Sequence, residues 1–442
     1  MSVKSLAYLL LAWSVAGAAW AGLDIQRWST PQGARVYFVE NHDLPMLDVS
    51  VAFAAGSAYD PPGRPGVANL TRHLLNLGAG ELDEQQIAEQ LADVGAQLGG
   101  FFDADRAGVT LRTLSSARER ESALAILTTV LARPTFPDAV VEREKARAIA
   151  NLREAATKPE FLGEQAFQAA VFGTHPYAQP ETGTPESVAS VTRADLVAFH
   201  AGHYRPANLV VAIMGDIDRA GAAALANRLA EGLPAGAGVA PLPPVPVLAQ
   251  AEDKVIPHHA TQSHLFIGQP GMTRDDPDYF PLLVGNYILG GGGFDSRMIE
   301  EIRQKRGLAY SAYSYFIPMR QRGPFQIGLQ TRRDATDQAL AVVRETLRAF
   351  LDQGPSESEL QQAKDNLVGS FPLRLDSNRK ILDHLAMLGF YELPADWLDT
   401  YTVKVAAVTR EDILRAFRAR VNPSTLVTVV VGGQRGADGG EK

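Results

Sequence analysis

Residues 289–316, LGGGGFDSRMIEEIRQKRGLAYSAYSYF, set the interpretation of the whole chain because their pattern changes twice within a short distance. Four consecutive glycines permit backbone angles that side chains forbid, so they predict a tight loop. Asp295 or Ser296 can then cap a helix that ends at Gly307. From Leu308 the apolar residues alternate with a period of two, which is typical of a strand. The segment therefore predicts a turn, a helix and a strand in direct succession.

Two polar side chains of this segment are candidates for function, Arg297 and Tyr310. On composition alone, they would be a solvated cation in a first helical turn and a half-buried aromatic of a strand. A phosphate loop is another possibility for a glycine run. The run lacks the Lys-Ser/Thr of a P-loop, and at the G-x-G-x-x-G spacing Asp295 or Ser296 occupies the third glycine position. The residues therefore disfavour nucleotide binding.

Size and charge limit the classes of protein that the chain can represent. Its 442 residues suit two domains of about 200 residues each. The net charge of −8 provides no global attraction for nucleic acid or anionic lipid. There are no cysteines, so an exported form would depend on its hydrophobic cores rather than on disulfides.

The first residues have the features of a signal peptide. Lys4 supplies a positive charge, residues 6–18 are largely apolar, and Ala19-Trp20-Ala21 has the small-x-small form of a cleavage site. The alternative is an uncleaved anchor, but the apolar stretch is shorter than the roughly 20 residues that span a bilayer. We therefore expect cleavage after Ala21 and export, with no membrane span in the mature chain.

The quoted segment resembles the C-terminal-domain signature of the M16 (pitrilysin-type) zinc peptidases, and the resemblance extends from about Leu23 to Gly433. It implies an α+β fold of two similar domains, each an antiparallel sheet with helices on one side. It also implies that Arg297 and Tyr310 bind the peptide substrate. A guanidinium offers donors to peptide carbonyls, and a phenol can donate toward an oxygen on which charge develops.

In that family, a helix equivalent to residues 67–77 carries His-x-x-Glu-His, with two zinc ligands and the base that activates water. The matching residues here are Asn69-Leu70-Thr71-Arg72-His73. The amide of Asn69 is a poor zinc ligand, and Arg72 places a permanent cation where catalysis needs a base. Of these three functional positions only His73 matches the family.

The third zinc ligand of the family is a glutamate on a later helix, which residues 141–152 resemble. In an ungapped alignment, Glu144 matches the first conserved glutamate of that helix and Asn151 matches the ligand. A lone histidine is more often a hydrogen-bonded core or surface residue than a metal ligand. We therefore expect no metal on this chain and zinc in a partner subunit.

A segment rich in glycine and proline, GLPAGAGVAPLPPVPVL at residues 232–248, divides the chain and is typical of a linker. The order of elements appears again after it as a weak internal repeat. The expected divisions are a signal peptide (1–21), an N-terminal M16-like domain with a degraded zinc motif (22–232), a linker (233–250), a C-terminal M16-like domain with the Arg/Tyr motif (251–433) and a disordered tail (434–442).

The smaller members of the family pair two chains around a peptide chamber, and in some bacterial pairs one chain keeps the zinc motif while the other keeps the Arg/Tyr pair. The resemblance therefore implies a non-catalytic, substrate-binding subunit of a heterodimeric periplasmic zinc peptidase that degrades peptides. Its partner would carry His-x-x-Glu-His and receive Arg297 and Tyr310 at its active site. One alternative is a peptide-binding or structural assembly subunit without a peptidase partner. Another is a self-sufficient metallopeptidase, which would need a new ligand cluster near Arg297 that the sequence does not show.

Overall fold

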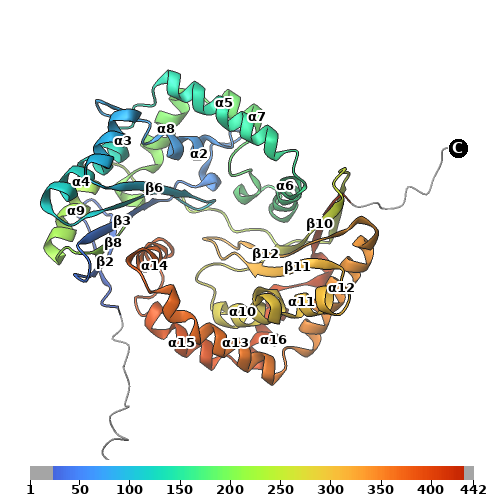
Figure 1. Ribbon diagram of the computed structural model, residues 1–442. Helices are drawn as coiled ribbons and strands as arrows, with labels where there is room; N and C mark the ends of the chain where they lie inside the picture. The colour runs from blue at the N-terminus through green and yellow to red at the C-terminus, as the bar shows by residue number, and fades with distance from the viewer. Residues whose placement is uncertain (1–22, 433–442) are drawn as a thin grey trace, which may run out of the picture.

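The computed structural model describes residues 23–432, so the expected signal peptide and tail lie outside the described residues. Two sheets, one from each half of the chain, form the inner layers of the molecule (Figure 1). The strands of the N-terminal sheet follow the order β1 (Gln26–Ser29), β2 (Arg35–Glu40), β8 (Leu209–Gly215), β3 (Met46–Phe53), β7 (Ala107–Leu114) and β6 (Gln97–Phe102). Within residues 23–432, no helix is both long and apolar enough to cross a bilayer.

The second sheet repeats this plan with strands from the C-terminal half. Their order is β11 (Ala309–Phe316), β12 (Pro324–Arg332), β10 (Gln262–Pro270), β13 (Val427–Val431) and β9 (Glu252–Ile256). The predicted α+β class with two similar domains is confirmed. The strand pairing differs in one detail, because each sheet contains one parallel pair, β2 with β8 and β13 with β9, among antiparallel neighbours.

Helices cover the outer side of each sheet (Figure 1). Those of the N-terminal half are α2 (Val67–Leu74), α3 (Glu84–Asp93), α4 (Ala117–Ala132), α5 (Asp138–Ala155), α7 (Pro185–Ser190), α8 (Arg193–His203) and α9 (Arg219–Glu231). Those of the C-terminal half are α10 (Tyr279–Asn286), α11 (Arg297–Ile299), α12 (Thr336–Gln353), α13 (Glu357–Gly369), α15 (Trp397–Ala407) and α16 (Arg410–Arg420).

The two halves exchange one helix each, so helices lie on both faces of each sheet rather than on one. Helix α14 (Asn378–Tyr391) packs on β8 and β3, and α6 (Pro159–Phe172) packs on β10 and β13. A Cβ atom at Gly389 of α14 would lie 2.6 Å from Val210 Cγ1, so this helix approaches the strand closely. Strand β8 is buried along its whole length, which explains its continuous apolar sequence LVVAIMG.

A buried carboxylate joins the two halves. Asp105 has no exposed surface and accepts hydrogen bonds from the hydroxyl groups of Tyr177 and Tyr391, the latter at 3.0 Å. It also accepts one from the backbone N–H of Arg320 at 2.7 Å. Burial raises the pKa of this carboxyl, and three donors from both sides of the junction satisfy its oxygens. Polar contacts therefore join the two halves in addition to the apolar contacts.

Residues 233–250, the expected linker, contain no helix or strand, yet they are held in place. Leu242 and Val245 are buried, and their carbonyl oxygens accept from Gln321 Nε2 at 3.1 Å and Arg322 at 2.7 Å. The Gly/Pro-rich composition predicts a segment without regular structure. Only the tertiary structure shows that this segment is packed against the rest of the chain.

The glycine segment contains more helix than expected. Helix α10 continues into a π-helical turn, Tyr287–Gly291, and Gly290 packs so closely that a Cβ would lie 2.4 Å from the backbone nitrogen of Ser314. The predicted helix before Gly307 consists of α11 and a second π-helical turn, Glu300–Gln304. Gly307 has φ +60°, the left-handed conformation expected at a helix end.

Strand β11 departs from the predicted strict alternation. Its register shifts between Ala309 and Ala312, so Tyr310 and Ser311 both face solvent. An extra residue in one strand of an antiparallel pair re-aims the neighbouring side chains. The irregularity therefore places the tyrosine that the sequence analysis singled out on the surface.

Candidate functional site

Helix α2, which carries the residues matching the zinc motif, begins at a capped end. The carboxylate of Asp60 accepts from the N–H of Gly66 at 2.8 Å and of Ala68 at 2.7 Å, so it satisfies free donors of the first turn. Asp60 is 6% exposed, and burial raises the pKa of its carboxyl to about 7 despite these hydrogen bonds. The cap positions the next two turns of the helix.

His73 on α2 contacts Glu144 on α5. The distance from His73 Nε2 to Glu144 Oε2 is 2.9 Å, and Arg143 Nε donates to the other carboxylate oxygen at 2.9 Å. Burial opposes the charged form of Glu144, but the hydrogen bonds from His73 and Arg143 outweigh it and lower the pKa of the carboxyl. The imidazole nitrogen that faces α5 is therefore already used within the chain.

Three residues that the alignment matched to the zinc site line one cavity. Asn69, His73 and Asn151 surround a volume of about 510 Å³ together with Glu144, between α2 and α5. The residues that the alignment matched on α2 and α5 are therefore neighbours in space. Apolar side chains complete the lining of the cavity, which lacks the metal ligands that its position in the fold would otherwise supply.

Arg72, the fourth matched position, points away from this cavity. Its Nε donates to the carbonyl oxygen of Gly108 at 3.3 Å, and its guanidinium lies against Gly100, where a Cβ would be 1.3 Å from an Arg72 nitrogen. Burial lowers the pKa of this arginine. The side chain therefore packs beneath the edge strand β6, and only a glycine leaves room for it.

The residues of this cavity do not fit zinc. A zinc site needs neutral imidazoles, thiolates or carboxylates in a tetrahedral arrangement. Here one imidazole is bonded to Glu144, two positions are amides and the position of the base is a cation directed elsewhere. Throughout residues 23–432, the structure has no group of three or more His, Cys, Asp or Glu side chains that could hold a metal ion.

In the C-terminal half, Arg297 is bonded within the chain through two of its three guanidinium nitrogens, Nε and Nη2. Its guanidinium donates to both carboxylate oxygens of Glu359, at 2.6 and 2.7 Å, and to the carbonyl oxygen of Gly354 at 2.9 Å. Burial opposes the charge of Glu359, but the bonds from Arg297 and Ser356 lower its pKa to about 2. Arg297 therefore ties α11 to the start of α13, and in the described part of the chain it makes no hydrogen bond or ring contact with Tyr310.

Tyr310 instead belongs to an exposed cluster with two residues that the sequence analysis did not single out. The guanidinium carbon of Arg303 lies 4.5 Å from the ring centroid of Tyr310 and 4.8 Å from that of Phe294. Tyr310 is 80% exposed and Phe294 is 67% exposed. The three residues, called here the Tyr310 cluster, form a cation–aromatic surface. Its only signal in the sequence is that Gly307 reverses the chain between Arg303 and the strand.

The fold and these two regions define a peptidase-like protein. Its helices α2 and α5 occupy the positions of the zinc-binding helices but do not carry the full set of zinc ligands or the base. Two family models match the chain. Residues 35–184 match Insulinase (Peptidase family M16), and residues 190–367 match the Peptidase M16 inactive domain.

Relatives cover nearly the whole chain. A crystal structure of a peptidase M16 inactive domain from Pseudomonas fluorescens is 38% identical, with a TM-score of 0.90 over 93% of this chain and 98% of that chain. A Helicobacter pylori protein described as a non-peptidase homolog is 26% identical over 90% of this chain and 92% of its own. An uncharacterized zinc protease of Streptomyces coelicolor is 25% identical over 88% and 85% of the two chains. The chain belongs to the M16 peptidase family, as a non-catalytic homologue.

Proposed function

We propose that this chain is the substrate-binding subunit of a heterodimeric periplasmic M16 zinc peptidase that degrades peptides. The partner is a second M16 chain that carries His-x-x-Glu-His and holds the zinc. This chain contributes Tyr310 to the shared site, and it contributes no metal and no base of its own.

The observation that carries the proposal is the Tyr310 cluster. The ring of Tyr310 is 80% exposed and therefore stabilises the fold little. The guanidinium of Arg303 nevertheless lies over one face of this ring. The phenol and the guanidinium therefore keep free donors toward solvent. Donors held at a rigid surface suit the carbonyl oxygens of a peptide that lies between two subunits.

The structure supports a division of labour between the two arginines of the segment. Arg297 donates to Glu359 and Gly354 through Nε and Nη2, so in our proposal its main role is to position α11. Arg303, which stacks on Tyr310, takes the substrate-contacting role that the sequence analysis gave to Arg297. The periplasmic location rests on the signal-peptide pattern of residues 1–21, which lie outside the described residues.

The test is co-expression with each zinc-bearing M16 chain of the same genome, followed by size exclusion and peptide digestion. We expect a stable pair that cleaves peptides only in the presence of metal. Tyr310→Phe should lower kcat by about 10²-fold through loss of a donor to the developing oxyanion. Arg303→Gln should act mainly on KM, and Arg332→Gln, an exposed arginine of β12 paired with Asp334, is the control. A chain that stays monomeric beside every such partner, or a pair fully active with both substitutions, contradicts the proposal.

A further inference from the structure

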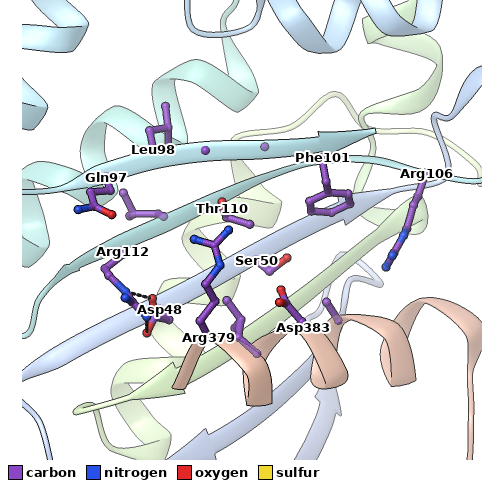
Figure 2. A pocket seen from close by; sticks show the side chains of 15 residues that line it. Asp48, Ser50, Gln97, Leu98, Phe101, Arg106, Thr110, Arg112, Arg379 and Asp383 are labelled. Atoms are coloured by element: carbon purple, nitrogen blue, oxygen red, sulfur yellow. Dashed lines mark hydrogen bonds and ion pairs between the residues drawn. The ribbon is translucent and has the colours of Figure 1, made fainter. Parts of the chain in front are cut away.

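A second cavity, of about 420 Å³, lies where the two halves meet, on the face of the N-terminal sheet that α14 covers. Its walls come from β3, β6 and β7 on one side and from α14 on the other (Figure 2). It lies on the opposite face of the sheet from α2, so it is separate from the cavity that matches the zinc site. It is also separate from the Tyr310 cluster.

Most of the charge around this cavity is neutralised by pairs within the chain. Arg112 donates to both carboxylate oxygens of Asp48, at 2.7 and 3.1 Å. Arg106 donates to Asp103 at 3.0 Å, and its guanidinium lies 5.2 Å from the ring centroid of Phe101. The remaining charged side chains of the cavity are the two that α14 contributes.

Those two side chains are Arg379 and Asp383, one helical turn apart on α14. Figure 2 shows both rising from the helix toward the strands, Arg379 toward Thr110 and Asp383 toward Ser50. Within residues 23–432, neither makes a hydrogen bond or an ion pair, although residues four apart on a helix can reach each other. By contrast, the neighbouring Lys380, outside the cavity, is paired with Asp376 at 2.8 Å.

The neutral polar groups of the walls also have unused hydrogen-bonding capacity. The side chains of Ser50, Gln97 and Thr110 line the cavity and have no hydrogen-bond partner in the described part of the chain. Ser50 is 2% exposed, and its hydroxyl group can donate to or accept from a molecule in the cavity. A cavity of this size with a few convergent polar groups is typical of a small-molecule site.

From one unpaired cation, one unpaired anion and these hydroxyl groups, we infer that the cavity binds a small zwitterion with a free ammonium and a free carboxylate. A free amino acid and a short peptide both have this chemistry. The carboxylate contacts Arg379, the ammonium contacts Asp383, and the hydroxyl groups of Ser50 and Thr110 serve the remaining polar atoms. A purely anionic ligand would be repelled by Asp383 and a purely cationic one by Arg379, whereas a zwitterion meets a side chain of opposite charge at each end.

The inference can be tested on the isolated full-length chain, because it requires neither a partner nor activity. Titration calorimetry with alanyl-alanine is the reference, and free alanine distinguishes an amino-acid site from a peptide site. N-acetyl-alanyl-alanine lacks the ammonium, and alanyl-alanine amide lacks the carboxylate. We expect saturable binding of at least one of the two zwitterions and about 10-fold or greater weakening for each blocked form of the dipeptide if the dipeptide binds.

Two variants assign the contacts. Asp383→Asn should weaken binding of the zwitterion, and N-acetylation of the ligand should then cause no further loss of affinity. In Arg379→Gln, C-terminal amidation of the ligand should cause no further loss of affinity. Both positions are exposed, so the fold should tolerate the changes, and Lys380→Gln on the same helix should leave binding unchanged. The inference is overturned if neither zwitterion binds saturably to a folded chain. It is also overturned if blocked and free forms bind equally or if both α14 variants bind like the parent.

Discussion

The helix pair α2 and α5 and the glycine segment before β11 hold the residues that the family resemblance selects, and the contrast between the two regions lies in Tyr310. Around α2, His73 bonds to Glu144 and Arg72 packs beneath β6, so both side chains have partners within the chain. Around β11, the backbone is tightly packed, and Tyr310 projects into solvent with Arg303 over its ring.

This difference separates residues kept for the fold from residues that the fold does not need. A polar group with a partner inside the chain stabilises that chain, and its presence calls for no ligand. An exposed ring held in one position contributes little to folding, so its contacts are available to another molecule. The contrast predicts that substitutions in the scaffold of either region change stability, whereas substitutions in the Tyr310 cluster do not.

The largest effect is expected at Gly290. In Gly290→Ala the new Cβ would lie 2.4 Å from the backbone nitrogen of Ser314, and backbone cannot move aside as a side-chain end can. Overpacking of this kind costs about 1 to 3 kcal/mol or more of unfolding free energy. Urea unfolding measures it. Gly369→Ala, at the end of α13 with no atom within 4 Å, is the control and should be neutral or slightly stabilising. Equal stability of both variants would mean that the glycine segment is not tightly packed.

Arg297→Ala should have the next largest effect. It leaves the carboxylate of Glu359 without its bidentate partner at a site where Arg297 is only 20% exposed, so we expect a loss of about 2 kcal/mol. The pKa of Glu359 is about 2 in the fold and 4.5 ordinarily. The stabilisation by the charged pair is therefore present above about pH 4.5 and is lost as the pH falls toward 2.

The measurement for this pair is unfolding free energy as a function of pH in parent and variant. The two curves should differ above about pH 4.5 and approach each other toward pH 2. Arg332→Ala, which removes a fully solvated ion pair, should cost close to nothing. An Arg297→Ala chain as stable as its parent at neutral pH would return Arg297 to the list of substrate contacts.

A smaller, pH-dependent effect is expected at the cap of α2. The pKa of Asp60 is raised to about 7, so between about pH 4 and 7 the folded chain holds a proton that the unfolded chain releases. Its contribution to unfolding free energy therefore falls as the pH rises through this range, by at most about 1.4 kcal/mol per pH unit. Asp60→Asn removes the titrating group, so parent and variant should differ in slope there. If unfolding free energy depends on pH in the same way in parent and variant, burial does not raise the pKa of Asp60.

The smallest effect on stability is expected for Tyr310→Phe. The hydroxyl belongs to a ring that is 80% exposed, and Arg303 can stack on phenylalanine as well. The melting temperature should stay within the error of the measurement, while the assembled pair loses turnover. Loss of stability or pairing in this variant would assign Tyr310 to the fold and would remove the contrast between the two regions.

Much of the site could be predicted locally because it depends on short-range patterns. The resemblance matched Asn69, His73 and Asn151 to one site of the family, and in the structure these three residues line one cavity. The resemblance also implied that Arg297 and Tyr310 both bind the substrate, and that role stays a prediction. The bidentate bond to Glu359 comes from a helix far along the chain, and no local pattern indicates it.

The sequence was sufficient for the class of fold, through the family that its motifs resemble, and for the glycine-dependent turn, because motif and turn residues are neighbours in the chain. The tertiary structure alone decided which polar groups are satisfied and which are free. In the folded chain, α6 and α14 each pack on the sheet of the other half, and Arg72 lies against Gly100. Arg379 and Asp383 line a cavity together with strands of the N-terminal sheet. Hydrogen bonds and burial are made between residues far apart in the chain, so these properties appear only once the chain is folded.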